Sequence, residues 1–259
     1  MHIIDAHIHL DMYENKNRQR ILTELEAEKI AMLISVSNDY QSAVKTLQIA
    51  MDDHRIKPTF GYHPEQPLPS MVEMNQFFTW IEQNKEKMIA IGEVGLPYYL
   101  RKENEQIELT PYIQLLTRFI ELSVRMDKPI ILHAVYEDAP LVCTLLEEFS
   151  VKKAHFHWFK GDQKTLERII QQNYVISVTP DVCYKRKIQQ IVAQTPIENL
   201  LVETDGPWPF EGPFRGEMTH PKMLHASIEM IASIKDLSVN AVYDQLYENT
   251  VDFYCLDKR

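Results

Sequence analysis

The sequence predicts an α/β protein, a (β/α)₈ TIM barrel with its active site at the C-terminal ends of the strands. Short apolar runs alternate with longer amphipathic segments from end to end, which indicates parallel strands joined by helices. The chain has 259 residues, a usual length for one such barrel. No linker, internal repeat or change of composition interrupts the pattern, so we expect one domain over residues 1–259.

Eight of the apolar runs have the length of strands, and a barrel of this type has eight strands. The predicted strands are Ile3–His9, Ile30–Val36, Lys57–His63, Met88–Glu93, Pro129–His133, Lys153–Trp158, Tyr174–Val178 and Asn199–Asp205. The segments between and after them follow the helical period. The predicted helices are Tyr40–Asp53, Met71–Lys85, Thr110–Met126, Glu137–Phe149, Lys164–Gln172, Lys185–Gln194, Lys222–Ile234 and Asn240–Tyr254.

The glycines lie on one side of this pattern. All seven fall at or just after the carboxyl end of a predicted strand: Gly61, Gly92, Gly95, Gly161, Gly206, Gly212 and Gly216. Glycine favours turns, which accounts for part of this distribution. Its restriction to one side indicates elaborate loops on the face where barrels of this type build their active sites.

The charge balance is acidic. The chain carries 27 Lys and Arg against 37 Asp and Glu, a formal charge of −10. An extended nucleic-acid groove normally has a basic balance, so the sequence does not predict such a surface. Divalent cations bound at the active-site mouth would make that region more positive than the residue count indicates.

Cysteine usage and hydropathy indicate the cellular compartment. Cys143, Cys183 and Cys255 are far apart and form no CxxC pair, which predicts reduced, buried thiols. The sequence has no signal-peptide pattern, and no apolar run approaches the length of a membrane span. We therefore expect a cytoplasmic protein that does not enter the membrane, and the sequence indicates no obligate protein partner.

The first predicted strand carries Asp5, His7 and His9 at every second position. Residues two apart on a strand share a face, so we expect all three to point into the barrel and the intervening apolar residues to face the helices. Burying three polar side chains is costly unless each finds a partner. A metal ion bound by the two imidazoles, with Asp5 as a supporting group, would provide that partner.

Further ligand-type residues occupy the last positions of other predicted strands. His133 and His157 belong to the fifth and sixth strands, Glu93 ends the fourth and Asp205 ends the eighth. Separate core histidines are individually common. Their shared position at one rim, together with two carboxylates, favours a site for zinc, manganese or a similar divalent ion.

Six ligands exceed what a single hydrolytic ion with an open position takes, and they suit two ions that share a carboxylate. Such ions lie about 3.5–4 Å apart and act on both the attacking and the leaving oxygen. Glu93 is predicted as the shared carboxylate because its strand lies midway in sequence between the two histidine groups. The sequence therefore predicts two divalent metal ions per chain, Zn, Mg, Mn or similar.

The chain resembles the TatD family of metal-dependent hydrolases and deoxyribonucleases, within the amidohydrolase-type barrels. The resemblance runs nearly the full length, with these motifs in family order: IIDAHIHLD, GYHPE, IGEVGLPYY, KPIILHAV, HWFKG, VETDGPW and the closing YENTVDFY, which contains Asn249. It implies that His7 and His9 bind the first ion, that His133 and His157 bind the second, and that Glu93 bridges them.

The same resemblance implies the catalytic roles. Asp205 would bind an ion and orient or deprotonate the attacking water, so that Asp205 and Glu93 are the implied catalytic residues. His63 matches a contact to a substrate phosphate. Glu203 stands two residues before Asp205 on the same face, which fits a supporting role.

The chain departs from the family pattern beside the predicted metal centre. Pro97 stands where the family usually has Asp, Val135 where it usually has Arg, and Thr219-His220-Pro221 where it often has Asn-Glu-Pro. Two groups suited to positioning a phosphate are therefore missing, while all six metal positions are present. Four basic residues in nearby loops are the candidates to replace the missing charge: Arg101, Lys102, Lys160 and Arg215, of which Arg215 keeps its family place.

Two further residues have two interpretations each. His155 shares a face with His157, either as a supporting donor or as a core histidine with its own partners. Trp208 is the aromatic residue best suited to stack on a nucleobase, and packing of the barrel mouth accounts for it equally well.

The leading functional hypothesis is two-metal hydroxide attack on a phosphodiester in DNA ends or oligonucleotides, so single-stranded DNA ends are a predicted partner. One alternative is an amidohydrolase-like enzyme acting on a small-molecule amide or lactone, which the departures at Pro97 and Val135 favour. Another is a non-catalytic protein with a relic metal site. Other hydrolase and nucleotide-binding signatures, such as GxSxG, GxxxxGK[ST] and GxGxxG, are absent from the sequence.

Overall fold

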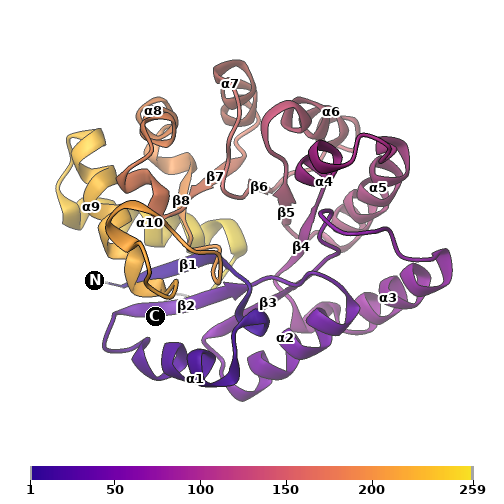
Figure 1. The fold of residues 1–259 in the computed structure, drawn as a ribbon, viewed down its shortest axis with the longest axis horizontal. Helices are drawn as coiled ribbons and strands as arrows, with labels where there is room; N and C mark the ends of the chain where they lie inside the picture. The colour runs from indigo at the N-terminus through magenta and orange to yellow at the C-terminus, as the bar shows by residue number, and fades with distance from the viewer. Residues whose placement is uncertain (1, 258–259) are drawn as a thin grey trace.

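The computed structural model describes residues 2–257 and contains all eight predicted strands (Figure 1). They are β1 Ile3–Ile8, β2 Ile30–Ser35, β3 Ile56–Phe60, β4 Ala90–Gly95, β5 Ile130–His133, β6 Ala154–Phe156, β7 Val175–Val178 and β8 Leu200–Val202. The strands pair in parallel in the order β1 to β8. The predicted barrel is confirmed, while the ends of the predicted domain, residues 1 and 258–259, lie outside the described part.

The barrel closes where the chain after β8 meets β1. The backbone N–H of Asp205 donates to the carbonyl of His7 at 2.9 Å, and the N–H of His9 donates to the carbonyl of Gly206 at 2.8 Å. These two hydrogen bonds join the carboxyl end of β1 to the segment after β8. They also fix the backbone positions of the predicted site residues His7, His9 and Asp205 relative to one another.

Helices form the outer ring of the barrel (Figure 1). They are α1 Asn15–Glu24, α2 Tyr40–Asp52, α3 Met71–Gln83, α4 Tyr98–Glu103, α5 Leu109–Met126, α6 Ala139–Glu148, α7 Gln163–Gln171, α8 Arg186–Gln194, α9 Leu224–Lys235 and α10 Val239–Tyr254. The eight predicted helices are confirmed to within a few residues. Helix α1 was not predicted because it buries only Ile21 and so has little apolar periodicity, and α4 is only six residues long.

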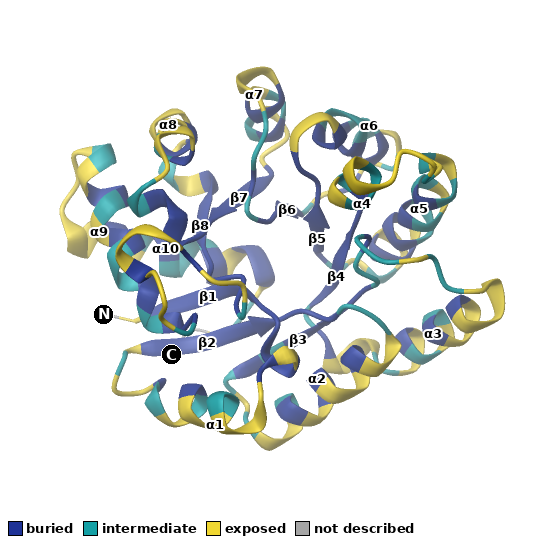
Figure 2. Cartoon of the chain, viewed as in Figure 1, coloured by how far each residue is buried: buried dark blue, intermediate teal, exposed yellow. Residues whose placement is uncertain are grey.

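The core has two main parts, and a small third cluster of Phe210, Phe214 and Met223 lies between β8 and α9. The strands are buried except at Lys57 of β3, while the helices expose their outer faces (Figure 2). The larger part lies between the strands and the helices. The smaller part fills the lower barrel interior, where Ile131 and Leu201 meet Phe253 and Tyr254 of α10. Helix α10 therefore closes the amino-terminal end of the barrel, and polar interior side chains collect at the opposite end.

Strand β1 differs from the prediction on one point. Its pairing with β2 has a register shift between Asp5 and Ile8. Ile4 and Ala6 therefore pack in the barrel interior, as His7 does, and Asp5 does not share the face of the imidazoles. The predicted alternation was wrong at this point because an irregularity in a strand changes which residues face inward.

Asp5 instead ties β1 to the segment after β8. Its carboxylate accepts hydrogen bonds from the backbone N–H and the hydroxyl of Thr204, at 2.9 and 2.5 Å, and from the N–H of His7 at 3.3 Å. Burial raises the pKa of Asp5 to about 7. Asp5 thus supports the site by holding backbone rather than by contacting an imidazole ring.

Gly95 sits where two strands approach too closely for a side chain, since a Cβ atom there would lie 2.0 Å from the carbonyl oxygen of His133. We expect Gly95→Ala to lower the free energy of unfolding by about 3 kcal/mol or more, because β4 and β5 must separate. Gly216→Ala is the control, at a backbone φ of 81° with no atom of residues 2–257 near the new Cβ, and should cost about 1 kcal/mol. Equal urea midpoints for the two variants would contradict this packing.

The three cysteines are free thiols with different exposure. Cys143 is buried as predicted, and burial raises its pKa to about 12. Cys183 is half-buried and Cys255 is exposed, so the prediction of buried thiols was wrong for Cys255. Among the helices of residues 2–257, none combines the length and the apolar character that crossing a membrane requires.

Candidate metal centre

The six predicted ligands converge at the carboxyl ends of the strands, and four of their donor atoms form a first group. The Nε2 atoms of His7 and His9 lie 3.4 Å apart. Glu93 Oε2 lies 3.2 Å from the first and 3.3 Å from the second. Asp205 Oδ1 lies 3.4 and 3.3 Å from the same two nitrogens.

The other oxygen of Glu93 faces a second group. Glu93 Oε1 lies 2.7 Å from His157 Nε2 and 3.0 Å from His133 Nδ1, and these two nitrogens are 3.2 Å apart. His63 Nε2 is 3.3 Å from the same oxygen. The Glu93 carboxylate therefore stands between the two histidine groups, with one oxygen towards each.

The donor set fits divalent cations. Glu93 Oε2 and Asp205 Oδ1 are buried and accept no hydrogen bond from any residue in the described range, although imidazole nitrogens lie nearby. A buried carboxylate oxygen without a partner is costly, and a cation between the carboxylates and the imidazoles removes that cost. Neighbouring ligands of a tetrahedral zinc ion lie about 3.3–3.4 Å apart, given bonds of about 2.0–2.1 Å. The spacings in the first group match this value.

The carboxylates are held in the form that binds a cation. Burial by itself raises the pKa of Glu93, but the imidazoles, His157 first among them, hold it well below its usual value. Burial by itself also raises the pKa of Asp205, but the neighbouring imidazoles, His9 first among them, lower it below its usual value. Both groups are therefore ionised at neutral pH.

Burial and the carboxylates of Glu93 and Asp205 also shift the pKa values of the imidazoles. Burial lowers the pKa of His7. Burial also acts to lower the pKa of His9, but the Asp205 and Glu93 carboxylates beside its ring outweigh it and raise the pKa to about 10. A cation that binds His9 must displace this proton, because an imidazole coordinates only in its neutral form. Cation binding at this centre is therefore expected to release protons.

Two residues at the strand ends adopt a left-handed backbone conformation. Asp205 has a φ of 50° and Trp158, which follows His157, has a φ of 37°. Such angles are uncommon for residues other than glycine and are found at functional sites. At Asp205 the hydrogen bond from its N–H to the carbonyl of His7 anchors this turn beside the first group.

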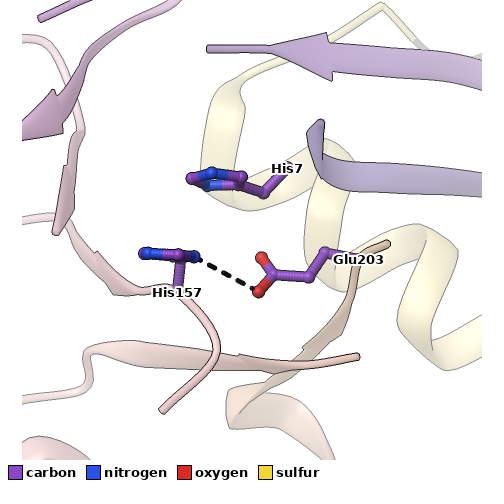
Figure 3. A group of neighbouring side chains, drawn as sticks. All are labelled: His7, His157 and Glu203. Atoms are coloured by element: carbon purple, nitrogen blue, oxygen red, sulfur yellow. Dashed lines mark ion pairs between the residues drawn. The ribbon is translucent and has the colours of Figure 1, made fainter. Parts of the chain in front are cut away.

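Glu203 lies deeper in the barrel with His7 and His157 (Figure 3). The rings of these two histidines stack with centroids 4.1 Å apart, and Glu203 Oε1 lies 3.5 Å from His157 Nδ1. The three donors are close enough to hold an ion. However, both Glu203 oxygens already accept hydrogen bonds, from Trp158 N at 2.7 Å and Ser177 Oγ at 2.5 Å. This geometry suits the predicted supporting role better than a ligand role.

A chain of hydrogen bonds leads from α10 to Glu203. Because the Ser177 hydroxyl donates to Glu203, it accepts from His155 Nε2 at 2.6 Å. His155 Nδ1 is then the acceptor for the Tyr254 hydroxyl at 2.7 Å. Burial holds the pKa of His155 well below its usual value, so the ring is neutral. Both interpretations of His155 thus hold in part: it is a core histidine with partners, and it supports Glu203 through Ser177.

Glu65 was not predicted as a site residue. It lies in the loop after β3, and its Oε1 is 3.0 Å from His133 Nε2. The same carboxylate accepts from the N–H groups of Tyr99 and Leu100 at the start of α4, at 2.9 and 2.6 Å. Glu65 therefore fixes the His133 ring so that Nδ1 faces Glu93. Its position two residues after His63 in the GYHPE motif was the only feature of the sequence that pointed to a role in the site.

The three predicted substrate contacts are placed differently. His63 lies against the second group through its contact with Glu93. Trp208 is 50% exposed. The Arg215 side chain is 79% exposed and pairs with Glu211 at 2.8 Å. The structure thus places His63 beside the six predicted ligands, while Arg215 forms an ion pair with a carboxylate of its own loop.

The departures from the family pattern have structural roles. Val135 is buried, so its side chain belongs to the packing under the mouth. The carbonyl of Thr219 accepts from the Tyr13 hydroxyl at 3.0 Å, and His220 Nδ1 accepts from Lys222 N at 3.1 Å. The Thr219-His220 segment therefore braces the loop after β8.

A (β/α)₈ barrel that gathers four imidazoles and two carboxylates at the carboxyl ends of its strands has the architecture of a metal-dependent hydrolase. A sequence profile of the family described as "TatD related DNase" matches residues 4–255. The chain belongs to this TatD family.

Several relatives share the full length. The chain is 36% identical over 255 residues to an "Uncharacterized metal-dependent hydrolase" of Haemophilus influenzae, covering 98% of this chain and 100% of the relative. It is 25% identical over 261 residues to "Deoxyribonuclease TATDN3" of Homo sapiens, covering 97% and 94%. Its fold matches the crystal structure of the TatD homologue YjjV from Escherichia coli K12, with a TM-score of 0.88, 22% identity and 98% of both chains covered.

Proposed function

We propose that this protein is a two-metal phosphodiesterase that acts on DNA ends or short oligonucleotides. The observation that carries the proposal is the position of Glu93, one oxygen towards His7 and His9 and the other towards His133 and His157. A buried carboxylate between two sets of imidazoles suits a pair of cations that share a ligand. The family description and the name of the human relative support DNA as the substrate.

Each residue has a part in this chemistry. Two bound divalent cations would supply Lewis-acid activation of water and of the scissile phosphate. His7, His9 and Asp205 would hold one cation, His133 and His157 the other, with Glu93 between them. The ionised Asp205 would orient the attacking water and accept its proton. His63, against Glu93, would donate a hydrogen bond to the phosphate from the ring nitrogen facing the centre.

The test is a comparison of substrates for protein reconstituted with Mn²⁺ or Zn²⁺. We expect kcat/KM for a short single-stranded oligonucleotide to exceed the values for lactone and amide substrates. A preference for a lactone or an amide would instead favour the amidohydrolase-like alternative. Stoichiometric metal without turnover of any substrate would favour a non-catalytic metal-binding protein.

Glu65→Gln tests the role of the residue that orients His133. Glutamine keeps the shape but removes the charge that holds the ring, so we expect affinity for the second cation to fall about 10–100-fold. Competition with a fluorescent chelator measures that affinity. Glu103→Gln, an exposed change at the end of α4, is the control and should leave both affinities unchanged. Loss of the first cation's affinity instead of the second would contradict the assignment of His133.

A further inference from the structure

A groove of about 1060 Å³ opens beside the second histidine group, between α7 and α8. Its side walls include Leu166 of α7 and Ile191 of α8, and its inner end is lined by Tyr99 and Lys160. The ring of Tyr99 lies 6.1 Å from that of His133, measured between centroids. None of the six predicted ligands lines the groove, and Tyr99 places its inner end next to His133.

Lys160 presents an uncompensated positive charge at this inner end. Its ammonium lies 3.6 Å above the centroid of the Trp158 ring and 3.4 Å from the Tyr99 hydroxyl. Within residues 2–257, no carboxylate oxygen forms an ion pair with it. The nearby carboxylate of Asp181 is engaged by Trp158 Nε1 and Lys185 Nζ, both at 2.9 Å. The side chain is thus held in place without being neutralised.

The surroundings of Lys160 disfavour its protonated ammonium when no anion is bound to it. Burial lowers the pKa of its ammonium to about 8, although the carboxylates of Asp181, Asp205 and Glu203 act in the opposite direction. The ammonium is half-buried and open to the groove, and it gains from an anionic ligand because charge-assisted hydrogen bonds are stronger than neutral ones. The aromatic face beneath it fixes the cation at the groove without using its N–H donors.

Lys160 also stands beside the position where a family arginine is missing. Its carbonyl accepts from the N–H of Tyr136, the residue after Val135, at 2.6 Å. Lysine at 160 therefore brings positive charge to the region that Val135 leaves without a donor.

We propose that Lys160 binds a phosphate of the substrate next to the one that is hydrolysed, with the adjoining nucleotide lying in the groove between α7 and α8. This inference rests on the proposed phosphodiesterase function and specifies its substrate as a strand end with at least two phosphates. Glu137 and Asp162 also line the groove, so we expect one phosphate site rather than a long basic track.

The activity test uses Lys160→Met, which keeps an unbranched side chain of similar length beside Trp158 and removes the charge. The substrates are a short single-stranded oligonucleotide and bis(p-nitrophenyl) phosphate, which has a single phosphate. We expect the ratio of their kcat/KM values to fall about tenfold in Lys160→Met, in favour of the single-phosphate substrate. Lys164→Met, an exposed lysine of α7 outside the groove lining, is the control and should keep the wild-type ratio.

A binding measurement separates this inference from the proposed function. Metal-free protein is titrated with a fluorescent single-stranded oligonucleotide at several salt concentrations. Removing one phosphate contact should reduce the slope of log affinity against log salt by about 0.7 in Lys160→Met. If the wild type hydrolyses neither substrate, the proposed function fails while this titration still tests the phosphate site. Equal affinities and slopes for Lys160→Met and Lys164→Met would overturn the inference.

Discussion

Glu93→Gln is expected to lower kcat by about 10³-fold or more, the largest effect of any single change in this protein. The variant keeps the shape of the side chain but replaces the charge that faces both histidine groups with a neutral amide. One amide oxygen cannot serve both sides, and the amide nitrogen is a donor that repels a cation. Two cations at close range would then lack the negative charge between them.

Metal analysis by mass spectrometry checks this expectation alongside the kinetics. We expect bound metal to fall from two ions per chain to one or fewer, with thermal unfolding of the metal-free protein still cooperative. Glu203→Gln is a useful comparison, because it removes a buried charge from the opposite side of the barrel interior without touching the bridging position. Near-wild-type activity with two ions bound in Glu93→Gln would refute the bridging role.

Asp205→Asn is expected to lower kcat by about 10²–10³-fold while most of the metal is retained. Asparagine has nearly the same shape and tolerates the left-handed conformation at φ 50°, so the turn and its hydrogen bond to His7 should persist. What is lost is the oxygen charge that would orient the attacking water and accept its proton. The main effect should therefore fall on kcat rather than on KM.

A matched control exists elsewhere in the chain. Asp236 is exposed at the end of α9 and has a φ of 54°, so Asp236→Asn makes the same chemical change in the same backbone conformation. This variant should have wild-type kinetics. If Asp205→Asn lost both metal ions together with activity, the loss of activity would be explained by the loss of metal. A separate role of Asp205 in proton transfer would then be contradicted.

Much of this architecture could be predicted because it repeats along the sequence. The alternation of apolar runs and amphipathic segments gave the eight strands and eight of the helices. Parallel strands end at one rim, so residues at the last positions of different strands meet, as His133, His157 and Asp205 do. Pattern alone sufficed for these features, since each depends on local spacing and on a regular topology.

Features that depend on irregularity or on distant contacts were missed. The register shift in β1 moved Asp5 away from the imidazole face, and no residue type in that strand signals it. Glu65 reaches His133 from a loop far away in sequence. The salt bridge between Arg215 and Glu211 was also missed. Both residues lie in one irregular loop, and the hydrophobic periodicity of a sequence does not predict the conformation of such a loop.

An anomalous-scattering crystal structure of the Mn²⁺-loaded protein tests whether two cations share Glu93. We expect two peaks, one among His7, His9 and Asp205 and one between His133 and His157, both adjoining the Glu93 carboxylate. A single peak, or one bound by His7, His157 and Glu203 together, would contradict this expectation.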